Sequence, residues 1–80
     1  MTQLQAIEAI AILAPKRTAI LNYAVQRTIH EWLEPSIEER YTLTLFVEGS
    51  CNEIALWGNF KNPQEAVDAV KQFLAKDEQP

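Results

Sequence analysis

The side chains that could carry acid, base or nucleophilic chemistry are few and lie far apart in the chain. His30 is the one histidine, and Glu34 follows it at a spacing at which a helix would let its carboxylate orient the imidazole as a general base. Cys51 is the one cysteine, but the nearby negative charges of Glu48 and Glu53 disfavour the thiolate that a nucleophile needs. Neither residue makes a catalytic site by itself, and we expect the protein not to be an enzyme.

Residue spacing also predicts no metal ion and no cofactor. One histidine and one cysteine cannot supply a zinc cluster, and the carboxylates of Glu34, Glu38 and Glu39 are typical of a solvated charge run beside a loop. The two glycines, Gly49 and Gly58, cannot form a glycine-rich phosphate loop. A binding surface is therefore the better candidate for function.

Charge and hydropathy narrow the class of partner. The 80 residues have a net charge of -4, and residues 34–80 hold 9 acidic side chains against 4 basic ones, a balance that disfavours nucleic acid. The longest apolar run, residues 9–14, is far shorter than the roughly 20 residues that span a bilayer. The first residues lack the basic flank of a secretory signal, and a lone cysteine agrees with a reducing compartment. We expect a cytoplasmic protein that does not contact membranes.

Two alternating segments on either side of Gly49-Ser50-Cys51-Asn52 predict a β-hairpin. A two-residue turn at Ser50 and Cys51 fixes which residues lie opposite each other. On one face the expected pairs are Val47 with Ile54, Leu45 with Leu56, Leu43 with Gly58, and Tyr41 with Phe60. On the other face they are Phe46 with Ala55 and Thr44 with Trp57.

A helix is predicted directly after the hairpin. Asn62 is a suitable N-cap, with Pro63 at the first helical position and Glu65 three residues after the cap. Its apolar stripe comprises Ala66, Val67, Val70, Phe73 and Leu74, and we expect the stripe to pack on Leu43, Leu45, Ile54 and Leu56. Residues 76–80 are expected to fray as an acidic tail.

Two further helices are predicted in the first 33 residues, separated by Pro15. Residues 2–13 carry apolar side chains at helical spacing, and so do residues 16–33, before Pro35. In the longer segment the apolar arc comprises Ile20, Leu21, Ala24, Val25, Thr28, Ile29 and Trp32. An alternative takes Ala9 to Leu13 as a third strand. The expected fold is a single α+β domain over residues 1–80 in the order ααββα, or βαββα in the alternative.

The predicted hairpin has two apolar faces, and one of them lacks an obvious cover. A lone two-stranded hairpin is marginal in water, so either the long helix or a partner must cover the second face. In the latter case the partner-binding residues are Phe46, Ala55, Trp57 and Thr44. We would then expect a protein-binding or regulatory module that acts through a sheet face or edge, with a protein partner or a second copy of itself in a homodimer.

The same surface leads to one expected mutational result and to one alternative function. If Phe46 and Trp57 form an interface, alanine at both positions should abolish binding and leave the fold intact. The alternative function is binding of single-stranded nucleic acid, with Phe46, Trp57 and Phe60 as stacking platforms and Arg40 and Lys61 near the phosphates.

Overall fold

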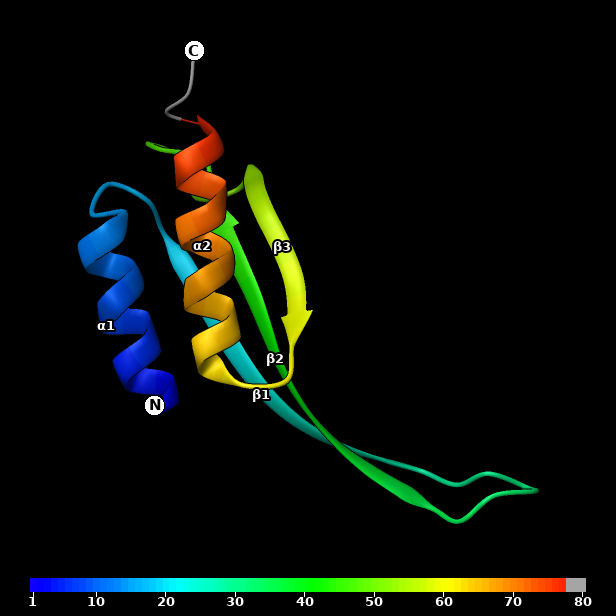
Figure 1. Cartoon of the computed structure of the whole chain (residues 1–80). Helices are drawn as coiled ribbons and strands as arrows, with labels where there is room; N and C mark the ends of the chain where they lie inside the picture. Colours follow the sequence, from blue (N-terminus) through cyan, green and yellow to red (C-terminus); the bar gives the residue numbers. More distant parts are fainter. Residues whose placement is uncertain (78–80) are drawn as a thin grey trace.

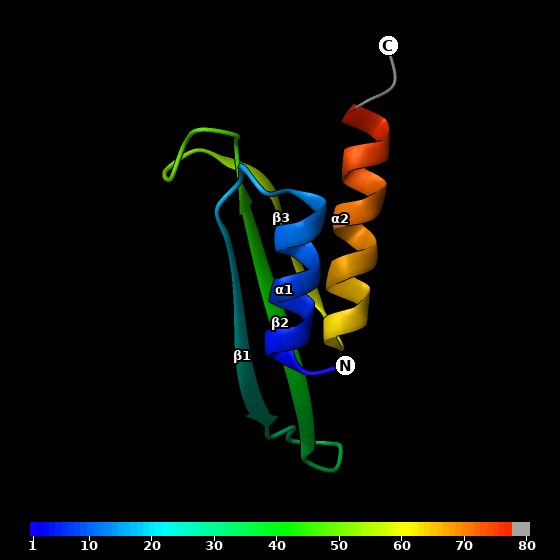
Figure 2. The same cartoon turned by 90° about the vertical axis from the view of Figure 1, so that its left-hand side faces the viewer.

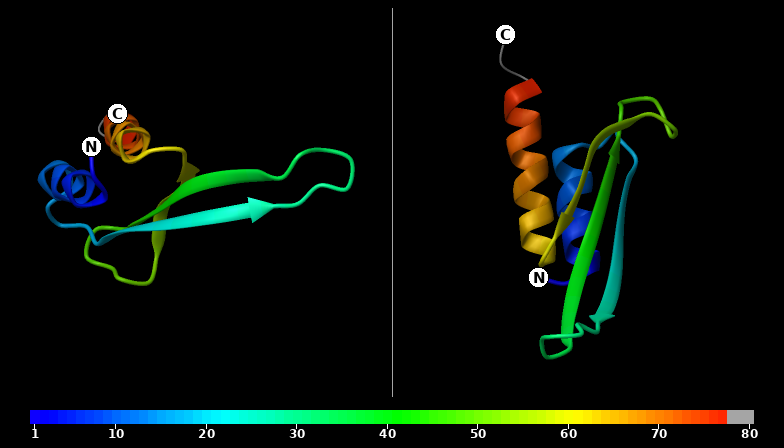
Figure 3. Two further views of the ribbon diagram at one scale, coloured as in Figure 1. Left: turned by 90° about the horizontal axis from the view of Figure 1, so that it is seen from below. Right: turned by 90° about the vertical axis from the view of Figure 1, so that its right-hand side faces the viewer.

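The computed structural model describes residues 1–77, which form two helices and a three-stranded antiparallel sheet in the strand order β1-β2-β3. The fold class is therefore α+β. Along the chain the elements are α1 (Gln3–Leu13), β1 (Ala19–Thr28), β2 (Ser36–Phe46), β3 (Ile54–Phe60) and α2 (Pro63–Asp77). The element order is αβββα, and both helices lie on the same side of the sheet (Figure 3, right).

The prediction of a long helix over residues 16–33 is wrong, because this segment contains β1. Its apolar residues fit a helical arc, but Leu21, Tyr23 and Val25 also alternate with more polar neighbours at the period of a strand. The central strand β2 decides between the two patterns, since it pairs with β1 without interruption from Ala19–Leu45 to Thr28–Ser36. A helix here would have left one edge of β2 without backbone partners.

The first helix is confirmed, and the alternative of a strand at Ala9 to Leu13 is wrong. Thr2 and Gln5 form a capping box: the Gln5 amide donates to Thr2 Oγ1 at 3.1 Å, and the Thr2 amide donates to Gln5 Oε1 at 2.8 Å. Ala6 and Ile10, one turn apart, are buried against the sheet. The amide of the Gln3 side chain donates to the Leu21 carbonyl and so joins α1 to β1.

The expected register of β2 with β3 is confirmed from Tyr41–Phe60 to Leu45–Leu56 and changes beyond that point. A bulge after Leu45 pairs Phe46 with Ile54, so the expected pairs Phe46–Ala55 and Val47–Ile54 are wrong. The connection is a longer loop rather than a two-residue turn. In it the Ser50 hydroxyl oxygen accepts from the amides of Asn52 and Glu53 at 3.3 and 3.1 Å, and Gly49 adopts a φ of 81°.

Helix α2 begins as expected at an Asn62 cap, whose Oδ1 accepts from the Glu65 amide at 2.9 Å. The Glu65 carboxylate accepts from the Lys61 amide at 3.0 Å, one residue before the cap, so the arrangement is a variant of a capping box. The helix continues through Asp77, which corrects the expected tail from residue 76. Residues 78–80 lie outside the described residues.

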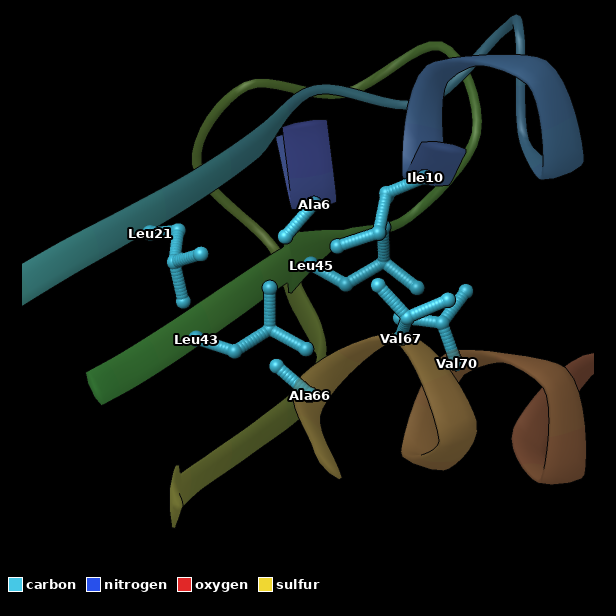
Figure 4. Packing of buried hydrophobic residues seen from close by; sticks show 8 residues of the cluster. All are labelled: Ala6, Ile10, Leu21, Leu43, Leu45, Ala66, Val67 and Val70. Atoms are coloured by element: carbon cyan, nitrogen blue, oxygen red, sulfur yellow. The ribbon is translucent and has the colours of Figure 1, made fainter. Parts of the chain in front are cut away.

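The core lies between the two helices and one face of the sheet (Figure 4). Both helices and the strands β1 and β2 contribute its buried side chains, which are Ala6, Ile10, Leu21, Leu43, Leu45, Ala66, Val67 and Val70. Leu56, Phe60, Phe73 and Leu74 pack against this cluster. Ile54 is 58% exposed, so its expected contact with α2 is wrong. The bulge moves it out of the alternation that placed it under the helix.

The hairpin of β1 and β2 is longer than the layer of helices that covers it. Strand β3 ends opposite Tyr41, whereas β1 and β2 continue as a two-stranded ribbon to Thr28 and Ser36. We call residues 24–40 the arm. The arm extends past the ends of both helices (Figure 1 and Figure 3, left). The molecule is accordingly elongated, with extents of 49 × 23 × 23 Å.

Candidate functional site

Within the described residues, no helix covers the sheet face opposite α1 and α2, and the loop between β2 and β3 bends toward one end of this face (Figure 2). Strand alternation places Ile20, Thr44 and Trp57 side by side across the three strands of this face. Ile20 is 44% exposed and Trp57 is 58% exposed, and the Thr44 side chain between them is partly buried. In the next row the Thr42 hydroxyl and Asn59 Oδ1 are hydrogen-bonded at 2.7 Å. The face thus combines a small apolar patch with polar neighbours.

The four expected partner-binding residues do not form one exposed surface. Trp57 and Thr44 are paired as expected and lie on the open face, and Ala55 is partly buried at the bulge. Phe46 is only 9% exposed and lies outside the main cluster. Its amide donates to the Thr18 carbonyl at 2.9 Å, and its carbonyl accepts from Arg17 Nη1 at 3.5 Å. Phe46 therefore contributes packing near the start of β1, and its ring offers little contact surface.

The arm carries a second group of exposed apolar side chains, and one of them, Trp32 at 88%, is the most exposed large apolar side chain on the described residues. They are Val25, Ile29, Trp32, Leu33 and Ile37, with exposures from 57% to 88%. Sequence reasoning missed them as a group because it placed the first four in or beside a helix. The alternation of residues 19–28 was the signal that could have identified β1, and with it the exposed position of Val25.

The two faces of the arm differ in chemistry. One face is polar: Gln26 lies opposite Glu38, and Thr28 lies opposite Ser36. Arg40 also forms an ion pair with Glu38 there, with 3.5 Å between the guanidinium nitrogen and the carboxylate oxygen. The other face continues the helix-covered side of the sheet, because the register of β1 with β2 has no break.

On this helix-side face, the side chains change along the strands toward the tip of the arm, from buried apolar to aromatic and then to a mixture of apolar and charged. Leu21 and Leu43 are buried, and the rings of the next pair, Tyr23 and Tyr41, lie 4.9 Å apart between centroids. Beyond them come Val25 opposite Glu39 and Arg27 opposite Ile37. We call these last four residues the arm quartet. Neither α1 nor α2 covers the quartet, as the 57% exposure of Val25 and the 71% exposure of Ile37 show.

A groove of about 630 Å³ lies at the base of the arm, where β3 has ended and β2 continues. Ile37, Glu38, Glu39 and Arg40 line it from β2, and Asn59, Phe60 and Lys61 line it from the end of β3. Because β3 does not pair with this part of β2, one backbone edge of β2 faces the groove. The groove thus offers both side chains and strand edge to a binding partner.

Next to the arm, the side chain of Tyr23 has a shifted pKa. The pKa of Tyr23 is raised above its usual 10.0, and desolvation is the largest cause. The hydrogen bond that its hydroxyl donates to Glu39 Oε1 at 3.2 Å, and the charge of that carboxylate, raise the pKa further. The folded state therefore favours the neutral phenol. The resulting contribution to stability is present below pH 10.0 and is lost as the pH rises through the folded pKa.

This gives a prediction that spectroscopy can check. In a Tyr41→Phe variant, where Tyr23 is the remaining tyrosine, the phenolate absorbance should appear with a midpoint above pH 10.0. Adding Glu39→Gln should lower that midpoint, because the acceptor charge is removed. A midpoint at or below 10.0 without the Glu39 change would contradict the contact between Tyr23 and Glu39.

The residues with catalytic potential are not assembled into a site. His30 and Glu34 lie in the connection between β1 and β2 rather than on a helix, so the expected helical spacing between them is absent. Cys51 is exposed in the loop between β2 and β3. The residues that the structure describes contain no group of three or more histidine, cysteine or carboxylate side chains suited to a metal ion.

Comparison with known proteins gives no relative, since no family model, curated protein or solved structure matches the chain. Among residues 1–77, no helix is both long and apolar enough to cross a membrane.

Proposed function

We propose that this protein is a protein-binding module of regulatory or adaptor type that acts through its sheet and associates with itself. The observation that carries the proposal is the arm, a two-stranded ribbon whose large apolar side chains are 57% to 88% exposed. Fully burying one such side chain is worth about 1.5 to 3 kcal/mol. Covering several of them gives a partner a strong driving force, and leaving them in water favours aggregation.

The marginal stability of a two-stranded ribbon supports the same proposal. Isolated hairpins need a further strand or a packed face to be stable in water. Among residues 1–77 the arm has neither, because β3 ends opposite Tyr41 and the arm extends past the ends of both helices. A protein partner supplies what is missing, either by packing on the helix-side face or by pairing with the β2 edge in the groove.

The open face offers a second, smaller contact surface. Ile20 and Trp57 are partly exposed there on either side of Thr44, and a partner that contacts the face would bury both. This retains Trp57, Thr44 and Ala55 as proposed contact residues. Phe46 is not included, because its ring is buried within the chain.

The experiment is affinity capture of the tagged protein from its native lysate, with and without nuclease. Three baits are compared: the unchanged chain, an arm variant with Val25→Ser and Ile37→Ser, and an open-face variant with Trp57→Ser. All three sites are exposed, so the folded state should be retained, which circular dichroism checks. A stoichiometric protein that resists nuclease and is lost with the arm variant supports the proposal.

Two results would contradict it. One is a bound protein that both variants retain unchanged. The other is recovery of nucleic acid alone, which would favour the stacking alternative. For that alternative the open face offers Trp57, while Phe60 packs against the core and Phe46 is buried. The basic residues Arg40 and Lys61 share their groove with Glu38 and Glu39.

A further inference from the structure

We propose that the occupant of the arm is a second copy of this chain, packed face to face on the arm quartet about a two-fold axis. The inference rests on the proposed function and names the partner of the same surface. It begins from the pattern of the quartet. Val25 and Ile37 lie on one diagonal of the four residues, and the opposite charges Arg27 and Glu39 lie on the other.

A two-fold rotation can bring this pattern against a copy of itself so that apolar residues meet apolar residues and opposite charges meet. Consider two arms that face each other, with a two-fold axis between them along the diagonal from Val25 to Ile37. Each apolar residue then meets its own copy, and Arg27 of each chain faces the partner's Glu39. An axis parallel to the strands, or perpendicular to them within the interface, would instead place every apolar residue against a charge.

Strand geometry makes this arrangement feasible. Strands lie about 4.8 Å apart, and residues on one face repeat about every 6.8 Å, so the diagonal is inclined at about 35° to the strands. The two arms would therefore cross at about 70°, close to the orthogonal class of sheet packing. The exposed quartet and the adjacent groove leave room for a second arm to approach.

The elongated chain exposes more surface than a compact monomer of the same mass. The accessible surface is 5915 Å², whereas a compact monomer of 9.1 kDa exposes about 4,900 Å². The excess over the whole chain, about 1,000 Å², is of the same order as the roughly 800 Å² that each partner buries in a stable interface, so an elongated shape of this kind can be compensated by a dimer. The radius of gyration, 14.8 Å, likewise exceeds the value of about 11.6 Å for a compact chain of this length.

The test is sedimentation equilibrium of the full chain over a wide range of concentration, with a charge exchange across the proposed interface. The unchanged chain should reach twice the monomer mass of 9.1 kDa. Arg27→Glu and Glu39→Arg, each alone, should weaken the dimer by at least about tenfold, because like charges then face each other. The two changes together should restore it. Arg40→Glu is the matched control, because Arg40 lies on the polar face of the arm.

Three results would overturn the inference: a monomer at all concentrations, a dimer that ignores both single changes, or single changes that the double change does not rescue. Circular dichroism of each variant excludes loss of folding as the cause. A monomeric chain that still captures a different protein, lost with the arm variant, would overturn the second copy alone. A monomer that captures nothing would overturn the proposed function as well.

Discussion

Replacing Phe46 with alanine is expected to lower the free energy of unfolding by about 3 to 5 kcal/mol. The ring is 9% exposed, and the change would leave a cavity beside the hydrogen bonds that join Phe46 to Thr18 and Arg17. A domain of this length is stabilised by only about 4 to 12 kcal/mol in total. Urea unfolding followed by circular dichroism should therefore show a large decrease in midpoint, or a chain that is already partly unfolded.

Trp57→Ala is the matched comparison. Trp57 lies two residue pairs away on the same sheet, but its side chain is 58% exposed, so the expected loss is about 1 kcal/mol or less. This separates two residues for which the sequence predicted one role. If Trp57→Ala were as destabilising as Phe46→Ala, the open face would have to be covered in the isolated chain.

Leu43→Ala is expected to cost about 2 to 5 kcal/mol, the second large effect. Leu43 is fully buried on the central strand, and side chains from both helices meet it in the core (Figure 4). Neither helix can move to fill the space without losing contact with the other parts of the sheet. The same unfolding experiment measures the loss.

Its control is Ile54→Ala on β3. Ile54 is 58% exposed, so its replacement is expected to change the free energy of unfolding by about 0.5 kcal/mol. Equal effects of the two substitutions would mean that α2 packs on Ile54 as the sequence suggested, without the bulge after Leu45.

The second half of the fold could be predicted because its local signals agree with one another. The alternation of residues 41–47, the Asn62 cap and the apolar stripe of α2 all indicate one structure, and the register holds for Tyr41, Leu43 and Leu45. The bulge could not be predicted, because it depends on how the loop around Ser50 satisfies its backbone groups. That one shift separates Phe46 from Ala55 and exposes Ile54.

In the first half of the chain, the prediction was wrong at β1, because the residues of this segment fit both the helical period and the strand period. Ile20, Leu21, Ala24 and Val25 satisfy a helical arc, and the same segment alternates as a strand. A two-stranded hairpin is marginal in water and needs another strand, and this was a reason to prefer a strand over a helix here. Without β1 the arm does not exist as a unit, so the sequence placed the binding surface on the open face alone. The capping box of Thr2 and Gln5 was a usable signal for α1.

If the arm is the surface on which a partner binds, amide hydrogen exchange should detect the binding there. A free two-stranded ribbon should open readily, so peptides covering residues 24–40 should exchange fast in the dilute chain. In the assembled complex, formed with captured partner or with concentrated chain, those same peptides should become strongly protected. Protection confined to the helices, with the arm still exchanging fast, would contradict binding at the arm.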